Sequence, residues 1–479
     1  MFYGREKELA ELSALWRKNV ASLVTCRGRR RIGKSTLIQQ FAQVSGARFV
    51  KIEGRPPEPR LSNRDELAAF HDQLEVVAGR KIEPLTSWCQ AFARLDACID
   101  SRRTVLLLDE ISWMGRYASG FPGDLKIAWD NLFKRHEKLI VVLCGSVSTW
   151  ISANILNNTG FVGRASLNMT LKELEPVQCV RFWGKKASRI STHDIVDVLS
   201  VTGGIPRYLE EIDPSLSAEE NIRRLCFTPD ALLRDDFSKI FNVVFGDAAV
   251  TKRRILEALS EAPLTVTQLA DALKMERSGL LSHHLEDLMV AGFVAEDGGL
   301  NPDTGRMARL SRYRVSDNYT RFYLKYVKPH APEIADGRYE FVSLENLPEW
   351  NSIMGLSFEN LILNNFSLLL KPLHLEGIQI FSAAPFRKAA NDDGPGVQVD
   401  LLVQTRKSVV LVEVKRCAEI GESVEREVAE KVAKLKLPRT KSIRTALVYA
   451  GHLTKAVRGN GYFDALVDAA SFLQQPSMP

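Results

Sequence analysis

A glycine-rich segment near the N-terminus is the first part of the chain whose residue types and spacing indicate chemistry. Residues 28–35 read GRRRIGKS and match the pattern GxxxxGK[S/T] at every fixed position. A short apolar run over residues 21–26 predicts a buried strand before this segment, and residues 36–42 have helical apolar spacing after it. Strand, glycine-rich loop and helix form the context that a phosphate-binding loop requires.

Each fixed residue of this segment has a physical role in holding a nucleoside triphosphate. Gly28 and Gly33 let backbone N–H groups approach phosphate oxygens without a Cβ in the way. Lys34 can reach the β- and γ-phosphates, and the Ser35 hydroxyl can complete the coordination of Mg²⁺. Thr36, next along the helix, joins the expected nucleotide-binding residues. The alternative is an ordinary glycine turn with a solvated lysine.

Two carboxylates follow a second apolar run and strengthen the prediction of a nucleotide site. Residues 104–108 read TVLLL and end at Asp109 and Glu110. Such a continuous apolar strand is typical of the middle of a parallel sheet. Asp109 would lie beside Mg²⁺, and Glu110 would polarise the attacking water as the catalytic residue. The alternative is that the two acids cap the next helix.

A third apolar run, residues 139–144, predicts another buried strand and is followed by Ser146. Ser146 could contact the γ-phosphate or the attacking water, and it could equally be a helix N-cap. Both interpretations stay open at the level of the sequence.

The C-terminal third carries a second constellation of charged residues. Residues 397–403 and 408–415 predict two strands of a hairpin, separated by a turn at residues 405–407. Because alternate side chains of a strand share a face, Glu413 and Lys415 project together, and the hairpin brings Asp400 close to Glu413. We propose these three as catalytic residues. The alternative is a surface hairpin whose charges only solubilise it.

These residue types suit the cutting of phosphodiesters. Asp400 and Glu413 offer hard oxygen ligands to one or two Mg²⁺ ions, with Mn²⁺ as an alternative metal. The metal would polarise the scissile phosphate and lower the pKa of a bound water. Lys415 could orient that water or offset charge in the transition state. Strands this apolar make an unpaired Glu and Lys costly, which favours a functional pair.

The length of the chain requires several domains to position these two sites. The sequence has 479 residues, 45% hydrophobic and 25% charged. Such a composition is globular and excludes a mostly disordered chain, a collagen-like repeat and a disulfide-stapled miniprotein. At roughly 150 residues per domain, about three ordinary domains are expected.

Between the two sites, the pattern predicts a winged helix. Helical spacing covers residues 251–262, 265–273 and 276–292, and strands at residues 293–295 and 309–316 flank a polar loop. The third helix would present a mixed polar face to a major groove, formed by Arg277, Ser278, Ser282, His283 and His284. Since that face is not densely basic, a structural relay is favoured slightly over base reading.

Two further motifs show a family resemblance. Residues 2–8 read FYGREKE, an hhGRExE pattern, and residues 202–208 carry a GxP element. With the two phosphate motifs, they resemble the prokaryotic ATPases of the STAND/AAA+ group often called the archaeal ATPase family, over roughly residues 1–330. The resemblance implies that Gly4, Arg5 and Glu6 lie beside the adenine. It also implies that Pro206 belongs to a helical lid and that Arg164 approaches the γ-phosphate.

The C-terminal constellation resembles the PD-(D/E)XK nuclease superfamily, through Asp400 followed by Glu413-x-Lys415. Val399 stands where the motif name has proline. The resemblance implies that Glu359, on a helix opening near residue 358, is a further catalytic and metal-binding acid beside Asp400 and Glu413. The order of domains is similar to that of ATPases whose C-terminal region is a domain of unknown function with this nuclease pattern.

The expected fold is therefore α/β: a P-loop AAA+/STAND ATPase domain with a helical lid, a winged-helix domain and a C-terminal α/β restriction-endonuclease-like domain. The expected boundaries are an ATPase core at residues 1–170, a lid at 171–245, a winged helix at 246–328, a connector at 329–348 and a nuclease-like domain at 349–479. ATP and Mg²⁺ are the expected cofactors, with Ser35 and Asp109 as Mg²⁺ ligands in the first site.

Three functions fit these residues. The first is an ATPase coupled to a metal-dependent nuclease acting on DNA, most simply double-stranded, in genome defence or mobile-element biology. The second is a nucleotide-dependent DNA-binding switch with a non-cleaving nuclease-like domain. The third is an RNA-cleaving defence effector. AAA+ relatives form rings and STAND relatives rest as monomers, so a homo-oligomer through the ATPase domain stays open.

Composition indicates the compartment and refines the expected partner. No apolar run approaches the roughly 18 residues that span a bilayer, no signal peptide is recognisable, and seven scattered cysteines form no zinc pattern. A cytoplasmic protein with reduced thiols and no membrane partner is expected. Residues 403–460 carry 13 Lys+Arg against 6 Asp+Glu, so the net charge of +6 lies around the nuclease-like carboxylates. That location favours a polyanionic partner.

Overall fold

The structure is a computed structural model that describes residues 2–58, 60–146, 148–276, 279–302, 311–388, 396–435, 437 and 440–474. The chain divides into two compact units. The first comprises Met1–Leu174, Ser238–Ala249 and Val290–Gly292, and the second comprises Glu175–Phe237, Val250–Met289 and Phe293–Pro479. The five-part division expected from the sequence is finer than this and stays a prediction.

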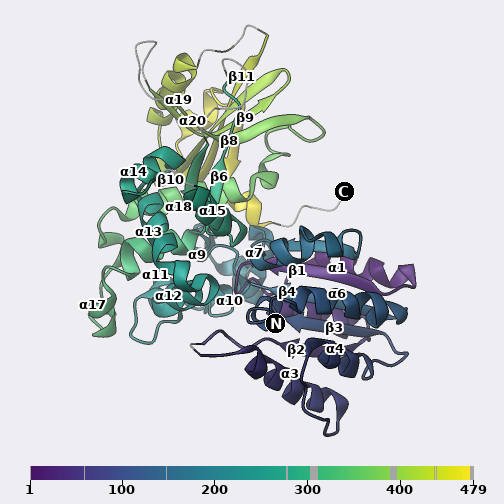
Figure 1. The fold of residues 1–479 in the computed structure, drawn as a ribbon. Coiled ribbons are helices and arrows are strands. Elements are labelled where there is room, and N and C mark those ends of the chain that lie inside the picture. The colour runs from purple at the N-terminus through teal and green to yellow at the C-terminus, as the bar shows by residue number, and fades with distance from the viewer. Residues whose placement is uncertain are drawn as a thin grey trace. The chain divides into compact units, whose positions relative to one another are not determined.

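The first unit is built on a parallel five-stranded sheet (Figure 1). Its strand order is β2-β3-β4-β1-β5, and each neighbouring pair is parallel. The strands are β1 (Ser22–Gly28), β2 (Arg48–Glu53), β3 (Thr104–Asp109), β4 (Leu139–Gly145) and β5 (Ala165–Leu171). The three apolar runs predicted as buried strands are thus β1, β3 and β4.

Helices cover both faces of this sheet, which explains why β3 and β4 have continuous apolar runs. The main ones are α1 (Glu6–Leu15), α2 (Lys34–Val44), α3 (Asn63–Ala78), α4 (Trp88–Asp96), α5 (Ile111–Met114) and α6 (Phe121–Asn131). Two separate apolar cores result. Leu106 and Leu108 of β3 pack in one core, and Val105 and Leu107 of the same strand pack in the other. Parallel sheets are stable because both faces are buried in this way.

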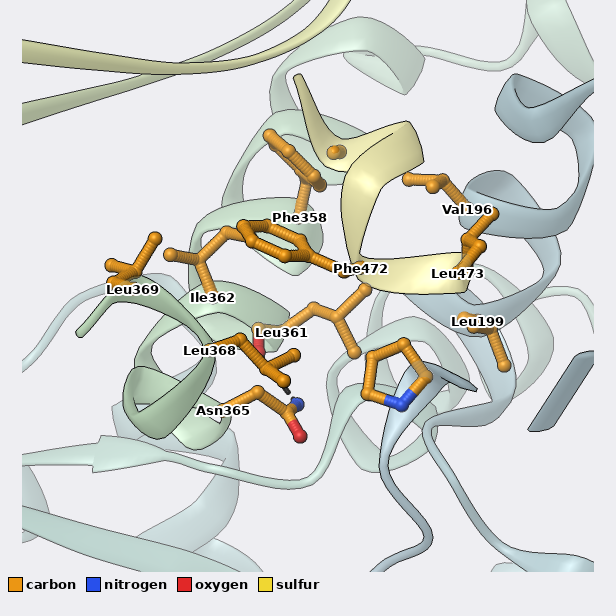
Figure 2. A pocket seen from close by; sticks show the side chains of 12 residues that line it. Val196, Leu199, Phe358, Leu361, Ile362, Asn365, Leu368, Leu369, Phe472 and Leu473 are labelled. Carbon is orange, nitrogen blue, oxygen red and sulfur yellow. Dashed lines mark hydrogen bonds between the residues drawn. The ribbon is translucent and has the colours of Figure 1, made fainter. Parts of the chain in front are cut away.

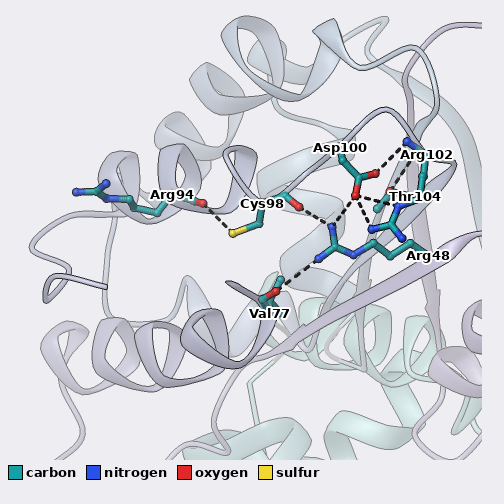
Figure 3. A network of polar contacts seen from close by, with 7 residues as sticks. All are labelled: Arg48, Val77, Arg94, Cys98, Asp100, Arg102 and Thr104. Carbon is teal, nitrogen blue, oxygen red and sulfur yellow. Dashed lines mark hydrogen bonds and ion pairs between the residues drawn. The ribbon is translucent and has the colours of Figure 1, made fainter. Parts of the chain in front are cut away.

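A polar network holds together the amino ends of β2 and β3, away from the carboxyl end of the sheet, where β1 leads into the phosphate loop (Figure 3). The Arg48 guanidinium donates to the Cys98 carbonyl at 2.6 Å and to Asp100 at 3.5 Å. Arg102 also donates to Asp100, at 2.6 Å, and these bonds lower the pKa of Asp100 to about 2. The network is structural, because it satisfies strand-end groups at the far edge of the sheet from the nucleotide loop.

The second unit begins with short helices and continues into a helix-turn-helix with a β-wing. The helices are α8 (Pro176–Cys179), α9 (Thr192–Thr202), α10 (Pro206–Leu209), α11 (Ala218–Cys226) and α12 (Leu232–Phe245), followed by α13 (Ala249–Glu261), α14 (Val266–Leu273) and α15 (Gly279–Val290). Residues 238–245 of α12 and the end residues Ala249 and Val290 are assigned to the first unit. Strands β6 (Val294–Asp297) and β7 (Arg312–Val315) pair antiparallel. The winged-helix prediction is confirmed in its elements.

The third helix of this module corrects one detail of the prediction. His284 was expected on the exposed face of α15, but its side chain is buried, as is that of Asp287 one turn on. Asp287 forms a buried ion pair with Lys252 of α13, so this face of α15 joins the module's core. Ser282 and His283 are exposed as expected. Arg277 and Ser278 lie outside the described residues.

The segment expected to be a connector, residues 329–348, contains helix. It holds α17 (Ala331–Ala335) and the helical turn η8 (Leu344–Asn346), preceded by α16 (Asn318–Phe322) and η7 (Tyr323–Val327). Leu344 and Ile334 are fully buried, because these turns pack as part of the second unit. Pro332 lies in the first turn of α17, where proline is tolerated.

The C-terminal sheet has the strand order β12-β11-β10-β9-β8. Its elements, in chain order, are α18 (Trp350–Asn364), β8 (Ile380–Lys388), β9 (Val397–Thr405), β10 (Ser408–Ile420), α19 (Ser423–Lys434), β11 (Ser442–Leu453), α20 (Lys455–Gly459) and β12 (Ala465–Asp468). β8, β9 and β10 form an antiparallel meander, while β11 lies parallel to β10 and β12 parallel to β11.

The helix before this sheet corrects a second expectation. It was predicted to open near Phe358, but α18 begins at Trp350, so Glu359 lies in its interior rather than at its start. The helix is apolar on most sides, as a fully packed helix must be. The turn predicted at residues 392–395 lies outside the described residues.

An apolar junction packs α18 against α9 and the last helical turn, η10 (Ala469–Leu473), as Figure 2 shows. Phe358 and Leu361 of α18 meet Leu199 of α9 and Leu473 of η10 around a small apolar space. The junction places the helix that precedes the GxP element in direct packing contact with the helix that carries Glu359.

Two properties of the whole chain complete the fold. No helix among the described residues combines the length and apolar character that crossing a bilayer requires. All seven cysteines are free.

Candidate nucleotide site and nuclease-like site

The phosphate loop lies between the end of β1 and the start of α2. Gly28 has φ 144° and Gly33 has φ 86°, which are conformations that glycine adopts without strain. A Cβ on Gly28 would lie 2.6 Å from the carbonyl oxygen of Leu171, so no larger residue fits. The buried Lys34 ammonium donates to the carbonyls of Gly28 and Arg29, at 3.0 and 3.1 Å, and thus points back across the loop. Thr36 lies in the first turn of α2.

The hydroxyl and the carboxylate expected to hold Mg²⁺ are in contact. Ser35 Oγ donates to Asp109 Oδ2 at 2.6 Å, and Asp109 is buried at the end of β3. A hydroxyl and a carboxylate side by side are hard oxygen donors of the kind that Mg²⁺ prefers, so these residues fit the ion. Lys51 of β2 was not predicted and lies 3.1 Å from the same Asp109 oxygen. Only the pairing of β2 with β3 could reveal it.

Glu110 and Ser146 form a second contact at this edge of the sheet. Ser146 donates to Glu110 through its backbone N–H, at 3.0 Å, and through its hydroxyl, at 2.8 Å. Glu110 has φ 49°, a left-handed conformation that is uncommon for a residue with a side chain. Gly54, which the sequence did not single out, allows this turn, because a Cβ there would lie 2.7 Å from the Glu110 carbonyl oxygen.

The N-terminal motif packs against the phosphate loop. The Arg5 side chain is buried and donates to the carbonyl of Ile32 at 3.2 Å and to that of Lys172 at 2.6 Å. Gly4 and Arg5 both have positive φ, and Glu6 begins α1. Arg5 therefore ties the start of the chain to the loop that carries Lys34. Contact of Gly4, Arg5 and Glu6 with an adenine stays a prediction.

The two remaining residues of the predicted nucleotide set lie in different surroundings. Arg164 forms a two-pronged ion pair with Asp130 of α6, at 2.8 and 3.0 Å, which lowers the pKa of Asp130 to about 2. The guanidinium is thus engaged with a carboxylate of its own unit. Pro206 is the first residue of α10, directly after the Gly203-Gly204-Ile205 segment. Its role in a nucleotide lid is untested by these contacts.

The β9–β10 hairpin brings the C-terminal charged residues together as predicted. The pairing of Val412 with Leu401 sets Asp400 opposite Glu413. Asp400 Oδ2 accepts from the Val414 N–H at 2.9 Å, and Lys415 Nζ lies 3.0 Å from Glu413 Oε1. Glu413 and Asp400 are both buried, so two carboxylates and a lysine converge in a site of low polarity.

Helix α19 completes this group with two residues. Lys431 Nζ donates to Glu413 Oε2 at 2.6 Å, so each oxygen of Glu413 faces one ammonium group. Glu427 accepts from Lys415 at 2.7 Å. Burial works against the charged form of Lys415, but Glu427 and Glu413 outweigh it and raise the pKa of Lys415. The sequence left two interpretations of the charged helix that carries Lys431 and Lys434: an ordinary solvated face, or the phosphate contacts that the resemblance to nucleases of this fold implies.

Glu359 reaches the same site from α18 through its electrostatic interaction with Asp400. Burial, and then the charge of Asp400, raise the pKa of Glu359 to about 7. Burial, and then the charge of Glu413, raise the pKa of Asp400 to about 6. Asp400 of β9 therefore interacts electrostatically with both Glu359 of α18 and Glu413 of β10. Repulsion between neighbouring carboxylates, together with burial, raises carboxylate pKa values.

The carboxylates have the chemistry that a divalent cation needs but are not closed around one. In the part of the chain that the structure describes, no three or more His, Cys, Asp or Glu side chains gather into a metal-holding group. Asp400 and Glu413 are nevertheless hard oxygen donors on facing strands, and backbone carbonyls and water can supply further ligands to Mg²⁺. The two residues fit the metal. The ammonium groups of Lys415 and Lys431 each contact one oxygen of Glu413.

The first unit defines the class of protein. A parallel sheet with β1 leading into the GxxxxGKS loop, and with Asp109 and Glu110 after β3, is a P-loop ATPase domain. Residues 2–212 match the family described as an ATPase domain predominantly from Archaea. This family implies a nucleotide cofactor with Mg²⁺. Residues 250–296 match a second family, described as the bacterial regulatory protein, arsR family, which is a helix-turn-helix family.

Two relatives come from Methanocaldococcus jannaschii. The chain is 22% identical to "Uncharacterized protein MJECL04" over 364 residues, which cover 75% of this chain and 76% of the relative. It is 44% identical to "Uncharacterized ATP-binding protein MJ0423" over 43 residues, 9% of this chain and 73% of the relative.

Two solved structures align with the chain at low sequence identity. The Walker-type ATPase of Pyrococcus abyssi aligns with a TM-score of 0.46 at 15% identity, covering 67% of this chain and 96% of that one. The ORC2 protein of Aeropyrum pernix aligns with a TM-score of 0.41 at 14% identity, covering 70% and 95%.

Proposed function

We propose that this ATPase is coupled to a metal-dependent nuclease in its C-terminal sheet and acts on nucleic acid, most simply double-stranded DNA. The observation that carries the proposal is the convergence of Asp400, Glu413 and Lys415 on one hairpin, with Glu359 interacting from α18. Burying two carboxylates beside a half-buried lysine without use would be costly. A role in genome defence or mobile-element biology stays part of this proposal.

In the ATPase site, the residues of the chain divide the work. Lys34 and the loop amides bind phosphates, Ser35 and Asp109 hold Mg²⁺, and Glu110 polarises the attacking water. Ser146, hydrogen-bonded to Glu110, keeps the carboxylate oriented or passes to the γ-phosphate when nucleotide binds. A bound Mg²⁺ supplies charge neutralisation between the β- and γ-phosphates.

In the nuclease-like site, Asp400 and Glu413 would hold the metal, which supplies polarisation of the phosphate and a more acidic bound water. Lys415 lies beside Glu413 and can orient a water toward the phosphorus, while its charge stabilises the oxyanions of the transition state. Lys431 is the second ammonium at Glu413 and can contact a neighbouring phosphate once a metal occupies that carboxylate.

The coupling of the two activities has a physical basis within the second unit. Helix α9, which leads into the GxP element, carries Asp197. Arg416, next to Lys415 on β10, donates to Asp197 at 2.7 and 2.8 Å. A displacement of α9 that accompanies nucleotide binding would therefore act directly on the strand that carries Glu413 and Lys415.

Cleavage assays with the full chain test the proposal. We expect Mg²⁺-dependent cutting of linear or plasmid DNA that disappears in Asp400→Ala and Lys415→Ala. Glu422→Ala and Lys407→Ala, at exposed positions of the same sheet and its flanking turn, are the matched controls and should cut normally. Equal cutting by Lys415→Ala and wild type would overturn the assignment.

A DNA-binding switch without cleavage is the second candidate. It is favoured by the helix-turn-helix match over residues 250–296 and by the two ammonium groups that already neutralise Glu413. It predicts ATP-sensitive DNA binding with no cleavage under Mg²⁺ or Mn²⁺. An RNA-cleaving effector is the third candidate, and the same assay with tRNA and single-stranded RNA separates it from the first.

A further inference from the structure

A cavity of about 140 Å³ lies in the second unit beside the nuclease-like acids. Three arginines from different elements line it: Arg314 of β7, Arg321 of α16 and Arg387 of β8. Glu359 lines it as well, and because the Glu359 carboxyl interacts with Asp400, the cavity borders the predicted cleavage site. Three guanidinium groups facing one space are an unusual concentration of positive charge for a protein interior.

Arg321 has hydrogen-bonding capacity left over in this cavity. Its side chain is 5% exposed, and its two terminal nitrogens donate to the carbonyls of Ser260 and Val315, at 3.1 and 3.2 Å. Its Nε is buried and has no hydrogen-bond partner. Leaving a buried donor of a charged group unpaired is costly, and a ligand in the cavity would supply the missing acceptor.

Arg387 is the second available donor. Among the described residues, no hydrogen bond or ion pair engages its guanidinium, although its charge acts on Glu359 and Asp297 from a distance. Arg314, by contrast, is held by Asp297 at 3.0 Å and by Asn360 and Asn364, so it forms a fixed wall. The cavity therefore has one immobile arginine and two with donors to spare.

We propose that this cavity is a phosphate subsite that holds a phosphate group of the nucleic-acid strand next to the cleavage site. Guanidinium groups match phosphate oxygens with paired, charge-assisted hydrogen bonds. The volume exceeds the roughly 10–15 Å³ that one water requires several-fold, so it admits a phosphate with attendant water. The naming of nucleic acid as the source rests on the proposed nuclease function, whereas the binding of phosphate does not.

Calorimetric titration with inorganic phosphate tests the site. The full chain with Lys34→Ala, in EDTA, removes the contribution of the nucleotide loop and of any metal. In this background, Arg387→Gln should weaken phosphate binding about tenfold, the loss expected for one charge-assisted pair. Arg406→Gln, an exposed arginine in the β9–β10 turn, is the matched control and should bind as the background does.

A second variant predicts a change of opposite sign. Glu359→Gln removes a negative charge from the cavity and should tighten phosphate binding several-fold, a result that misfolding cannot produce. Phosphate binding that is insensitive to both Arg387→Gln and Glu359→Gln would overturn the site.

Labelled duplexes identify the source of the phosphate. A 5′-phosphorylated duplex that binds better than its 5′-hydroxyl twin, with the difference lost in Arg387→Gln, indicates a strand end. Equal weakening of both duplexes in Arg387→Gln indicates an internal phosphodiester. If Arg387→Gln weakens the binding of inorganic phosphate but leaves the binding of both duplexes unchanged, the nucleic-acid assignment is overturned. If the wild-type chain binds phosphate in this cavity but cleaves no nucleic acid, the nuclease function is refuted and the phosphate site remains supported.

Discussion

At the scale of single residues, the nucleotide site is defined by direct hydrogen bonds between its functional side chains. Ser35 contacts Asp109, Ser146 contacts Glu110, and Lys34 spans the loop. Glu110 keeps a left-handed backbone that Gly54 makes room for. Strained residues at a site of chemistry are retained when they position a functional side chain, and Glu110 fits that description.

The roles of Lys34 and Glu110 can be separated by substitution. Lys34→Ala should abolish nucleotide binding, because the phosphates lose their ammonium. Glu110→Gln should bind ATP with near-normal affinity but turn over about 10²-fold or more slowly, since the amide cannot act as a base. Equilibrium binding of a labelled ATP analogue and steady-state phosphate release measure the two effects. Unchanged turnover in Glu110→Gln would remove it from the water-activating role.

Ser146 gives a finer test at the same scale. Ser146 donates to Glu110 through two groups, its hydroxyl and its backbone N–H. Ser146→Ala leaves the backbone N–H in place, so we expect a turnover loss smaller than that of Glu110→Gln with binding retained. A Ser146→Ala variant slower than Glu110→Gln would show that the hydroxyl acts on the nucleotide itself.

At the scale of elements, the second unit joins a helix that precedes the GxP segment to the strand of the nuclease-like acids. The Asp197–Arg416 pair links α9 to β10, and Asn318 of α16 donates to the carbonyls of Leu199 in α9 and Ser357 in α18. Apolar packing around Phe358 and Leu473 supports both links. Three elements that carry different predicted functions are thus held in one packed group.

The ion pair between α9 and β10 can be weighed by a double-mutant cycle. Both side chains are largely buried, so we expect a coupling of about 1–3 kcal/mol between Asp197→Asn and Arg416→Gln in the free energy of unfolding. The same variants should weaken the response of DNA cleavage to ATP. The exposed Arg102–Asp100 pair, whose coupling should be much smaller because solvent screens it, serves as the comparison.

The raised carboxylate pKa values predict a pH dependence of stability. The pKa of Glu359 is raised from 4.5 to about 7 and that of Asp400 from 3.8 to about 6 on folding. The folded protein therefore holds these protons more tightly than the unfolded chain does. Their stabilising effect is fully present below about pH 4 and is lost as the pH rises through about 6 to 7, at up to about 1.4 kcal/mol per pH unit for each group.

Urea unfolding of metal-free protein checks this dependence. We expect Glu359→Gln to become more stable relative to wild type as the pH rises from 4.5 to 7.5, because the amide never charges. Adding Mg²⁺ should reduce the difference by favouring the ionised acids. A difference between the two proteins that stays constant with pH would contradict the raised pKa of Glu359.

At the scale of the whole molecule, the excess positive charge lies in the segment that surrounds the nuclease-like site. Residues 403–460 carry 13 Lys+Arg against 6 Asp+Glu. Several of these cations are tied to acids, as Lys415, Lys431 and Arg416 are, so fewer than thirteen are free for a polyanion. Binding should therefore be electrostatic but moderate in its dependence on salt.

The salt dependence of DNA binding measures how many cations meet phosphates. The slope of log K against log salt is close to −0.9 for each phosphate neutralised on duplex DNA. We expect Lys434→Gln, on the exposed side of α19, to reduce the slope by about one phosphate, and Lys7→Gln in α1 to leave it unchanged. A slope that changes in Lys7→Gln but not in Lys434→Gln would place the DNA on the first unit.

The sequence by itself determined the nucleotide loop, the apolar strands β1, β3 and β4, the helices of the winged module and the β9–β10 hairpin, because these depend on short-range spacing and alternation. The hairpin register brought Asp400 to Glu413 as expected, since adjacent strands leave little choice of partner. Two local expectations failed, the start of α18 and the exposure of His284 on α15, because packing outweighs local pattern there.

Only the tertiary structure decided which distant residues meet. It paired Arg164 with Asp130, set Lys51 beside Asp109 and Lys431 on Glu413, and joined Asp197 to Arg416. It also gathered the arginines of β7, α16 and β8 around one cavity. These contacts join residues far apart in the chain, and their partners are chosen by the order and packing of whole elements, which no local pattern of side chains encodes.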